Sequence, residues 1–534
     1  MTNEQIREAI AAGHTCLGME FGSTRIKAVL IDDDHRVLAS GAVTWENRFE
    51  NGIWTYDLAD AVANMQMCFA ALRQEVEKLY GMALTRVGMI GISGMMHGLL
   101  ALDAGGELVT PFRTWRNTMT EPQAECLTEL FGMTIPQRWS IVHLLQLMQT
   151  EPACAARIDR ITTLSGYIHY LLTGVHALGC CEAAGMLPAG GDPTSPDYLP
   201  DMVVSFDTLA SEAGMPWRLR DIFPRVLRAG ACAGYLTEEG ARLLDPTGTL
   251  SPGIPFCPAE GDGGTGMVCT GSLAPGMAAV SAGTSTFGLF VLDRAPEHLD
   301  RHLELTVTPD GDPVIEIQST NGTAELDGWA SVIGDALGRL GVKTDAGALY
   351  EMLLSAAMDG HVGDGGIAAF NCLSGEHLLG LSAGRPLYVR RPDCTLQLSD
   401  FMRAQLFSVF APLAYGFSLM DACDAEKIVS VRAHGGLFRT RGAAQPVLAA
   451  ALGRPVTVSE GAGEGGPYGA ALLAAYAKNR GADETLAAYL QAHAPADAGE
   501  STVLPDPALC AEYRAYLQTY LRASDIERAA TVSI

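Results

Sequence analysis

The sequence predicts an α/β protein built from two similar halves, and three observations support this. The chain has 534 residues, more than the roughly 250–300 that one hydrophobic core supports. Short apolar runs alternate with helical patterns, and 59 glycines suit tight turns between strands and helices. A strand, a turn of glycine and hydroxyl residues, a second strand and an Asp occur at 16–32 and again at 277–293. This repeat indicates a duplication, with a boundary near residue 272.

The composition also limits the class of protein. Asp and Glu outnumber Lys and Arg by 61 to 36, a net charge of −25, which disfavours nucleic acid and anionic membranes as partners. Residues 1–13 are polar, and no uncharged apolar run of about 18 residues occurs. None of the 13 cysteines shows metal-type CxxC spacing. We therefore expect a cytoplasmic protein with reduced thiols.

The first half is expected to begin with a strand hairpin. Apolar runs flank the turn Phe21-Gly22-Ser23-Thr24-Arg25, and a third strand follows at 37–43. Two hydroxyl groups and a glycine backbone suit a phosphate cradle, to which Lys27 can add a cation. The remaining expected elements are a helix at 57–80, strands at 86–92 and 99–102, helices at 121–131, 140–149, 165–172 and 236–244, and a loop at 190–200.

The second half repeats the hairpin around Gly283, Thr284 and Ser285. Two hairpins lined by hydroxyl groups could close on the two ends of one polyphosphate. The glycine-rich stretch 461–466 precedes a helix, whose first turn is a candidate anion site. The other expected elements are helices at 324–340, 345–358, 399–422, 442–452, 468–478 and 505–523, and strands at 427–432 and 454–458.

Asp262 lies between glycines in the stretch Glu260-Gly261-Asp262-Gly263-Gly264-Thr265-Gly266. Glycine adopts backbone conformations closed to other residues and lets a ligand come close. The carboxylate is therefore expected to be accessible to a ligand rather than packed in the core. Asp-Gly is also ordinary turn chemistry, so this stretch taken alone leaves a surface turn as the alternative.

Four pieces of sequence, in order, resemble the FGGY carbohydrate kinases of the actin-like ATPase (hexokinase) superfamily. They are EFGSTRIK at 20–27, EGDGGTG at 260–266, SAGTSTF at 281–287 and HGGLFRT at 434–440, within a likeness from about 15 to about 478. The Met-His-Gly at 96–98 resembles the xylulokinase branch, whereas glycerol kinases carry Arg-Glu there.

The resemblance implies two duplicated actin-like (ribonuclease H-like) ATPase domains with a cleft between them. The domains would span 14–272 and 273–480, followed by a helical extension at 481–534. It also implies a soluble sugar kinase that uses ATP and Mg²⁺, and such families often form homodimers.

The resemblance assigns roles to individual residues. Asp262 matches the general base and, with Glu20, the Mg²⁺ ligands. Met96, His97 and Trp115 match sugar contacts, to which Asp262 is added. The residues that match the nucleotide contacts are Gly22, Ser23, Thr24 and Lys27 in the first phosphate loop, Gly283 and Thr284 in the second, and Gly435, Gly436 and Thr440 on the adenosine side.

Two departures from the family pattern affect the expected chemistry. Glu20 stands where an Asp is usual, and it is one methylene longer. Trp115-Arg116-Asn117 stands where the xylulokinase branch carries Trp-Asn-Asp, so an acidic sugar contact is missing and a cation is present. The expected acceptor is a ketopentose such as D-xylulose, converted to its 5-phosphate, with ribulose and other ketoses or polyols open. A sugar- or nucleotide-binding sensor with weakened metal chemistry is the alternative function.

Several candidates also have an ordinary structural explanation. Glu20 can be a strand-end carboxylate, Lys27 a solvated charge, and His97 and Trp115 core residues. The ordered set of motifs favours the functional interpretation, most clearly for Asp262. An alcohol is a poor nucleophile at neutral pH, so the transfer needs such a carboxylate as proton acceptor.

Overall fold

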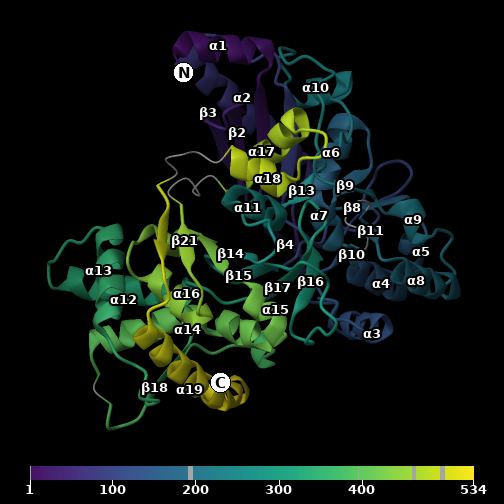
Figure 1. Cartoon of the computed structure of the whole chain (residues 1–534). Coiled ribbons are helices and arrows are strands. Elements are labelled where there is room, and N and C mark those ends of the chain that lie inside the picture. The colour runs from purple at the N-terminus through teal and green to yellow at the C-terminus, as the bar shows by residue number, and fades with distance from the viewer. Residues whose placement is uncertain (1, 191–195, 395, 460–464, 494–498, 534) are drawn as a thin grey trace. The chain divides into compact units, whose positions relative to one another are not determined.

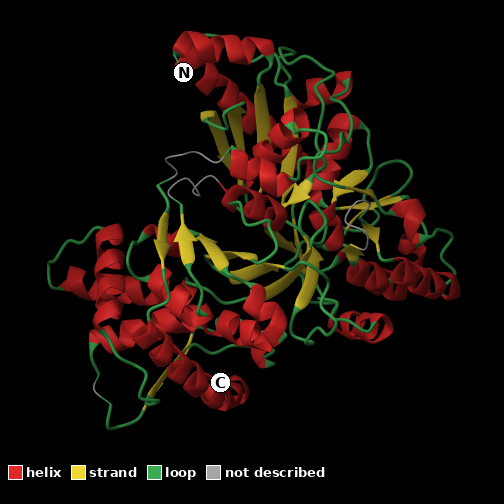
Figure 2. Cartoon of the chain, in the orientation of Figure 1, coloured by secondary structure: helices red, strands yellow, loops and turns green. Residues whose placement is uncertain are grey.

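The computed structural model describes residues 2–190, 196–394, 396–459, 465–493 and 499–533, so most of the glycine-rich stretch 461–466 lies outside it. The chain forms two compact α/β units (Figures 1 and 2). The first unit contains Met1–Leu273, Leu305–Pro313 and Glu464–Ala496, and the second contains Ala274–Glu304, Val314–Gly463 and Asp497–Ile534.

The first unit is organised around a five-stranded sheet with the order β13-β6-β1-β2-β3. The strands β1 and β2 form the expected antiparallel hairpin, while β1, β6 and β13 run parallel. The register aligns Glu20 and Glu260 with Ser93 between them, at the carboxyl ends of these parallel strands. The strands are β1 (Thr15–Phe21), β2 (Arg25–Asp32), β3 (Val37–Thr44), β6 (Met89–Gly94) and β13 (Glu260–Gly261).

Helix α17 (Gly465–Asn479) packs against β1 and β6 although it comes from the far end of the chain. The approach is close enough to require glycine. A Cβ at Gly18 would lie 1.9 Å from the carbonyl oxygen of Pro467, and one at Gly91 would lie 2.2 Å from that of Ala470. Helix α2 (Leu58–Tyr80) packs against β2 and β3.

The other short strands of the first unit pair in small two-stranded sheets, such as β7 with β8 and β9 with β12. The remaining elements of this unit, these strands included, are α1 (Asn3–Ala12), β4 (Arg48–Glu50), β5 (Ile53–Thr55), β7 (Leu100–Leu102), α3 (Glu121–Phe131), α4 (Ser140–Thr150), α5 (Pro152–Ala155), β8 (Arg160–Thr162), α6 (Leu164–Thr173), β9 (Ala177–Gly179), α7 (Cys180–Ala184), β10 (Ala189–Gly190), β11 (Asp197–Tyr198), α8 (Pro200–Glu212), α9 (Leu219–Ile222), β12 (Arg225–Leu227), α10 (Glu238–Leu244), α11 (Asp262–Thr270) and α18 (Leu486–Ala492).

The second unit repeats the same strand pattern. Strands β14 and β15 form an antiparallel hairpin, and β14 pairs in parallel with β20, as β1 does with β6. The strand order continues as β17-β15-β14-β20-β21-β22. These strands are β14 (Met277–Ala282), β15 (Thr286–Val291), β17 (Pro313–Ser319), β20 (Ser430–His434), β21 (Val456–Val458) and β22 (Ser501–Val503).

Helices α14 (Leu398–Leu419) and α19 (Pro507–Ser533) contribute to the core of the second unit, and Tyr513, Tyr516 and Tyr520 of α19 are among the largest fully buried side chains. The remaining elements are α12 (Ala324–Arg339), α13 (Ala346–Asp359), β18 (Ile367–Phe370), η1 (His377–Leu379), β19 (Leu387–Arg390), α15 (Ala422–Lys427), η2 (Gly436–Arg439) and α16 (Ala444–Leu452). Strand β16 (Glu304–Val307) begins at the last residue of a second-unit segment and continues into the segment Leu305–Pro313 of the first unit.

Some elements differ from the sequence expectation. Helix α1 forms in the polar start, where Thr2 and Gln5 make a capping box. The expected loop at 190–200 contains the paired ends of β10 and β11, and α8 already begins at Pro200. The compact units group segments by contact rather than by chain order. The domain limits 14–272, 273–480 and 481–534 therefore stay a prediction.

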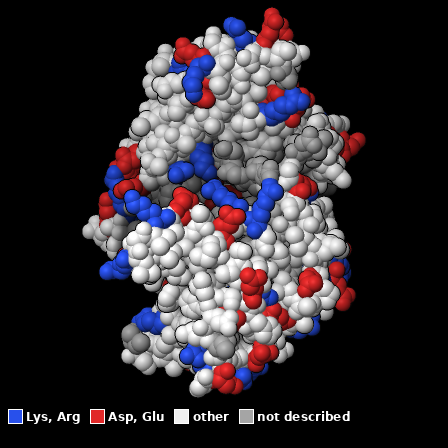
Figure 3. All heavy atoms as spheres, turned by 90° about the vertical axis from the view of Figure 1, so that its left-hand side faces the viewer, with Lys and Arg blue, Asp and Glu red and all other residues white. Residues whose placement is uncertain are grey.

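Two surface properties bear on the partners. On the face drawn in Figure 3, several basic side chains lie near the middle of the view with acidic side chains beside them, and charges of both signs are scattered over the rest of that face. Within the described ranges, no helix combines the length and the apolar character needed to cross a bilayer.

Candidate active site

Asp262 is the first residue of α11 and follows β13 directly. Its side chain is exposed, as the flanking glycines predicted. Protein nevertheless crowds it closely enough for desolvation to raise its pKa to about 6, against hydrogen bonds from the backbone of Gly263 and Met96 that lower it. The Gly263 N–H donates to Oδ1 at 3.0 Å. At neutral pH, Asp262 is therefore a carboxylate that is more basic than a free Asp.

Glu20 lies near the end of β1, opposite Lys27 on β2. Burial raises its pKa to about 7, the Lys27 charge lowers it, and the Asp262 charge raises it. The Lys27 Nζ is 3.7 Å from Glu20 Oε2. A Cβ at Gly466, in the first turn of α17, would lie 2.3 Å from Glu20 Oε1. The first unit thus brings Glu20, Lys27 and Asp262 into one electrostatic group.

Two aromatic residues donate hydrogen bonds to the backbone of the turn at Gly22-Ser23-Thr24. The Gly22 N–H donates to the carbonyl of Arg25 at 3.0 Å and closes the turn. Trp45 Nε1 donates to the carbonyl of Gly22, and the Tyr56 hydroxyl donates to that of Ser23, both at 2.7 Å. The two rings stack with centroids 4.3 Å apart. Neither aromatic lies in a recognisable motif, so the sequence alone did not point to either of them.

The loop after β6 carries Met96 and His97. His97 adopts a positive φ of 70°, which is rare for a residue with a side chain. Its Nδ1 lies 3.1 Å from the carbonyl of Gly185, so Nδ1 carries the proton and Nε2 keeps a lone pair. Burial holds its pKa well below the ordinary value, and the ring stays neutral. Met96 Cγ would lie 2.2 Å from a Cβ at Gly261, which places Met96 against the backbone beside Asp262.

Two buried glutamates lie behind this loop. The Glu182 N–H donates to Glu260 Oε2 at 3.0 Å, and the Ser165 hydroxyl donates to Glu182 Oε1 at 3.3 Å. Burial raises the pKa of Glu260 to about 8 and that of Glu182 well above its ordinary value. Burial thus favours the neutral form of both carboxyls, more strongly than it does for Asp262. Neither glutamate was expected from the sequence to have a role.

Trp115, Arg116 and Asn117 have separate roles in the structure. Asn117 is buried and exchanges two hydrogen bonds with the backbone of Trp54, at 2.9 and 2.8 Å. The Arg116 guanidinium lies over the rings of Trp54 and Trp115, 5.4 and 5.3 Å from their centroids. Trp115 is 38% exposed, so it is not a core residue. Just before it, the carbonyl of Arg113 would lie 2.0 Å from a Cβ at Gly98, so this segment packs against the His97 loop.

In the second unit, the loop of Gly283 and Thr284 joins β14 to β15. Thr284 is exposed, as Thr24 is in the first hairpin. The Thr323 N–H donates to the carbonyl of Gly283 at 2.8 Å. A Cβ at Gly322 would lie 2.2 Å from the same oxygen, so residues 322–323 support the loop by close backbone contact.

Gly435 and Gly436 lie beside this loop. The residue before them, His434, pairs with Ser281 at the end of β14. Gly435 has a φ of 114°, and a Cβ there would lie 2.3 Å from the carbonyl of Ala282. Thr440 follows η2. The second unit therefore brings Gly283, Thr284, Gly435 and Gly436 to one edge of its sheet.

No group of three or more His, Cys, Asp or Glu residues forms a metal-binding cluster within the described ranges. A cation held by Glu20 and Asp262 would thus have two protein carboxylates. That number fits Mg²⁺, which usually keeps several waters and binds one or two carboxylates together with substrate phosphates.

Comparison with known proteins covers most of the chain. The profile of the FGGY family of carbohydrate kinases matches residues 15–269 with its N-terminal domain and 278–478 with its C-terminal domain. The chain is 22% identical over 277 residues to the xylulose kinase of Klebsiella pneumoniae, covering 50% of this chain and 53% of that protein. It is 22% identical over 293 residues to the autoinducer-2 kinase of Salmonella typhimurium, covering 51% and 50%. The chain thus spans about half the length of these curated relatives.

Solved structures share the fold over nearly the whole chain. A xyloylose kinase from Brucella ovis superposes with a TM-score of 0.75 at 20% identity, covering 97% of this chain and 100% of that one. This likeness confirms the predicted fold class, two α/β domains of the actin-like type.

Proposed function

The chain belongs to the FGGY family of carbohydrate kinases, and we propose that it transfers the γ-phosphoryl group of ATP to a sugar hydroxyl. The observation that carries this proposal is Asp262, an exposed carboxylate with a pKa of about 6. It lies beside Met96 at the start of α11, while burial raises the pKa of the nearby Glu182 and Glu260. A base of this strength is ionised at neutral pH and still accepts a proton readily.

In the proposed reaction, Asp262 accepts the proton of the acceptor hydroxyl. The oxygen then forms its bond to the γ-phosphorus as the bond to the bridging oxygen of ADP breaks. The negative charge passes to the leaving ADP. The neutral ring of His97 and the side chains of Met96 and Trp115 would hold the sugar so that one hydroxyl faces Asp262.

We place Mg²⁺ at Glu20 and Asp262. When bound, the metal neutralises charge on the β- and γ-phosphates. Lys27 has its charge partly engaged by Glu20 and would approach the phosphates from the first hydroxyl turn. The nucleotide contacts proposed for the chain are Gly22, Ser23, Thr24 and Lys27, then Gly283 and Thr284, then Gly435, Gly436 and Thr440.

For the acceptor we propose a ketopentose, D-xylulose, phosphorylated at its 5-hydroxyl. Relatives named xylulose kinase support this choice. The segment Trp115-Arg116-Asn117 keeps ribulose and other ketoses or polyols open, because Arg116 adds a cation and Asn117 stands where the acidic sugar contact is expected. As an ATP-dependent enzyme it would act in the cytoplasm, and a homodimer is the assembly we propose to test.

The test is ADP release with ATP and Mg²⁺ in the presence of D-xylulose, D- and L-ribulose, L-xylulose, glycerol and common polyols. We expect one ketose to stimulate ADP release strongly, and stimulation by glycerol alone would reject the ketose assignment.

A second candidate function follows from the pKa of Glu20, which is about 7. A metal ligand that is partly protonated at neutral pH binds Mg²⁺ more weakly, as a sugar or nucleotide sensor could tolerate. Calorimetry separates the two functions. A sensor binds one sugar without stimulated ADP release, and Glu20→Asp would then restore the release.

A further inference from the structure

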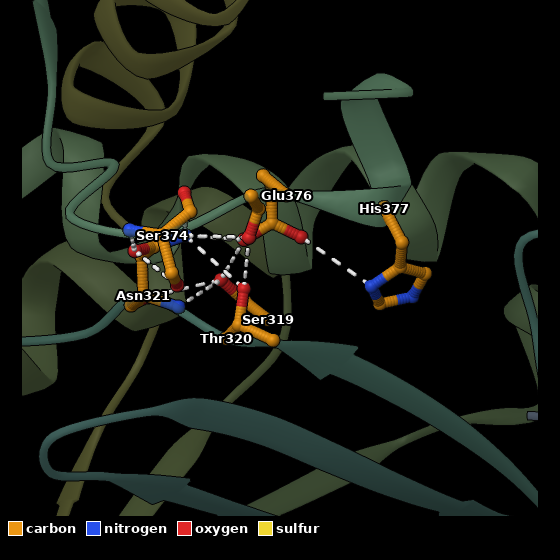
Figure 4. Close-up of polar contacts among 7 residues, drawn as sticks. Ser319, Thr320, Asn321, Ser374, Glu376 and His377 are labelled. Carbon is orange, nitrogen blue, oxygen red and sulfur yellow. Dashed lines mark hydrogen bonds and ion pairs between the residues drawn. The ribbon is translucent and has the colours of Figure 1, made fainter. Parts of the chain in front are cut away.

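Glu376 is fully buried in the second unit, between β18 and η1. Figure 4 shows its carboxyl group facing Ser319 and Asn321 from the end of β17. The Ser319 hydroxyl donates to Glu376 Oε2 at 2.7 Å, and Asn321 Nδ2 donates to the same oxygen at 3.2 Å. The other oxygen, Oε1, has no hydrogen-bond partner among the described residues and lies 3.6 Å from Nδ1 of His377.

The neighbouring contacts tie the same two segments together. Asn321 Oδ1 accepts from the backbone N–H of Ser374 at 3.1 Å and from its hydroxyl at 3.2 Å. Asn321 Nδ2 also reaches the carbonyl of Gly375 at 3.3 Å. The Ser319 hydroxyl lies 2.9 Å from the carbonyl of Asn321. Both side-chain polar atoms of Asn321 therefore form hydrogen bonds. These bonds, together with that of Ser319 to Glu376, fix the position of the backbone at 319–321.

The residues that follow Asn321 touch the proposed phosphate loop. Gly322 packs on the carbonyl of Gly283 with no room for a Cβ, and Thr323 donates its N–H to that carbonyl. The carbonyl of Gly322 accepts from Asn371 Nδ2 at 2.8 Å. The position of the backbone at 283–284 therefore depends on the position of Gly322 and Thr323, which follow Asn321 directly. A path of direct contacts leads from Glu376 through Ser319 and Asn321 to Gly283.

We propose that Glu376 is a positioning residue for the nucleotide, because its carboxyl group fixes Ser319 and Asn321 and thereby sets the place of the loop that carries Gly283 and Thr284. It touches neither substrate and acts through this loop. This proposal rests on the proposed kinase function, in which the loop of Gly283 and Thr284 binds a phosphate group of the nucleotide. A buried carboxyl with one oxygen that accepts no hydrogen bond is costly for the fold, and the positioning of this loop would account for its presence.

A matched set of variants tests the proposal. Glu376→Gln keeps an acceptor oxygen for Ser319 and Asn321 and puts an amide nitrogen at the unpartnered position. Glu376→Ala removes both contacts. Glu527→Ala is the control, because Glu527 is also a fully buried glutamate of the second unit with an unpartnered oxygen. It accepts the backbone N–H of Arg385 at 2.6 Å and lies outside the path to Gly283.

We expect Glu376→Ala to raise the KM for ATP about tenfold, with the KM for the acceptor changed less than about twofold. Glu376→Gln should restore the KM for ATP to within about threefold of wild type. Glu527→Ala should lower the melting temperature without changing the KM for ATP. A folded Glu376→Ala protein with an unchanged KM for ATP, or an equal rise in Glu527→Ala, would overturn the proposal.

The affinity for ADP, measured by calorimetry without any acceptor, separates this proposal from the proposed function. If no sugar is phosphorylated, the kinase assignment fails, while weaker ADP binding by Glu376→Ala still supports the positioning role. If Glu376→Ala does not fold, Ser319→Ala removes one of the two donors and carries the same expectation. Unchanged ADP affinity in that variant overturns the proposal.

Discussion

Arg116 is the residue whose chemistry bears most directly on the choice of acceptor. Its guanidinium lies over two indole rings, an arrangement that restricts the side chain while it keeps its hydrogen-bond donors. The segment before it packs against the loop of His97. A donor held in this way can bind the lone pairs of a carbonyl or hydroxyl oxygen on the sugar.

We therefore predict that Arg116→Met raises the KM for the acceptor about tenfold and leaves the KM for ATP within about twofold, since it removes charged donors from one substrate only. Arg160→Met is the control, because Arg160 lies 4.8 Å from the ring centroid of Tyr170 in another part of the first unit. Steady-state kinetics with varied sugar and varied ATP give both constants. Equal changes for the two substrates would show that Arg116 acts elsewhere.

The sequence predicted some of these residues well and others not at all. Glu20, His97 and Asp262 lie in short motifs whose glycines and order carry information, and the first unit brings Glu20 and Asp262 close enough to influence each other's charge. Trp45, Tyr56 and Glu376 come from segments without a motif. Their roles depend on contacts with residues 23 to 57 positions away, which no local pattern contains.

Among the elements, the turn between β2 and β3 combines strain with a buried histidine. His35 has a φ of 64° and is 4% exposed. Its Nε2 lies 2.9 Å from the hydroxyl of Tyr489, and its carbonyl accepts from Tyr468. Burial lowers the pKa of His35 from 6.5 to about 4, with the His493 charge acting in the same direction. The turn is thereby joined to α17 and α18.

The pKa of His35 predicts a loss of stability in mild acid. The unfolded chain takes up the proton near pH 6.5 and the folded protein only near pH 4. The contribution of His35 is therefore complete above pH 6.5 and falls as the pH drops toward 4, by about 2 kcal/mol at pH 5. His35→Asn, which tolerates the positive φ, should lose this part of the pH dependence. Urea unfolding at pH 7.5 and pH 5 measures it, and an unchanged difference between these pH values would argue against a neutral buried His35.

The close packing of β1 against α17 predicts that an added methyl group at Gly18 destabilises the protein. Gly18→Ala would place a methyl group 1.9 Å from a backbone oxygen that cannot move without shifting the helix. We expect a loss of about 1–3 kcal/mol in unfolding free energy. Gly338→Ala, at a helical position with no atom within 4 Å of the new Cβ, should instead stabilise by about 0.5–1 kcal/mol. Urea unfolding compares the two, and equal effects would contradict the close packing of α17.

Most helices and strands could be predicted from the sequence, but the way in which distant elements pack together could not. The two hairpins and the long helices were predicted, because their apolar periods are strong. Helix α17 was also predicted, but its place against β1 was not. Small residues such as Gly18 and Gly91 are the trace that this packing leaves in the sequence, and glycine has many other uses.

At the scale of the whole molecule, the chain leaves the first unit and returns to it. The segment Glu464–Ala496 belongs to the first unit although the second unit precedes it in the chain. A fragment of residues 1–273 should therefore lack cooperative unfolding, because β1 and β6 lose the helix that covers them. Joining 464–496 to it through a flexible linker should restore a cooperative urea transition. Cooperative unfolding of 1–273 alone, with the same midpoint, would contradict this.

Asp262 is the residue on which the proposed phosphoryl transfer to a sugar depends most, as the general base. The most direct measurement is formation of the sugar phosphate by wild-type and Asp262→Asn protein, followed by mass spectrometry, with sugar affinity measured by calorimetry. We predict product with the wild type, and a rate lower by about 10²–10⁴-fold or more in the variant, at nearly unchanged sugar affinity. Product formation by Asp262→Asn at the wild-type rate would contradict the proposed role of Asp262.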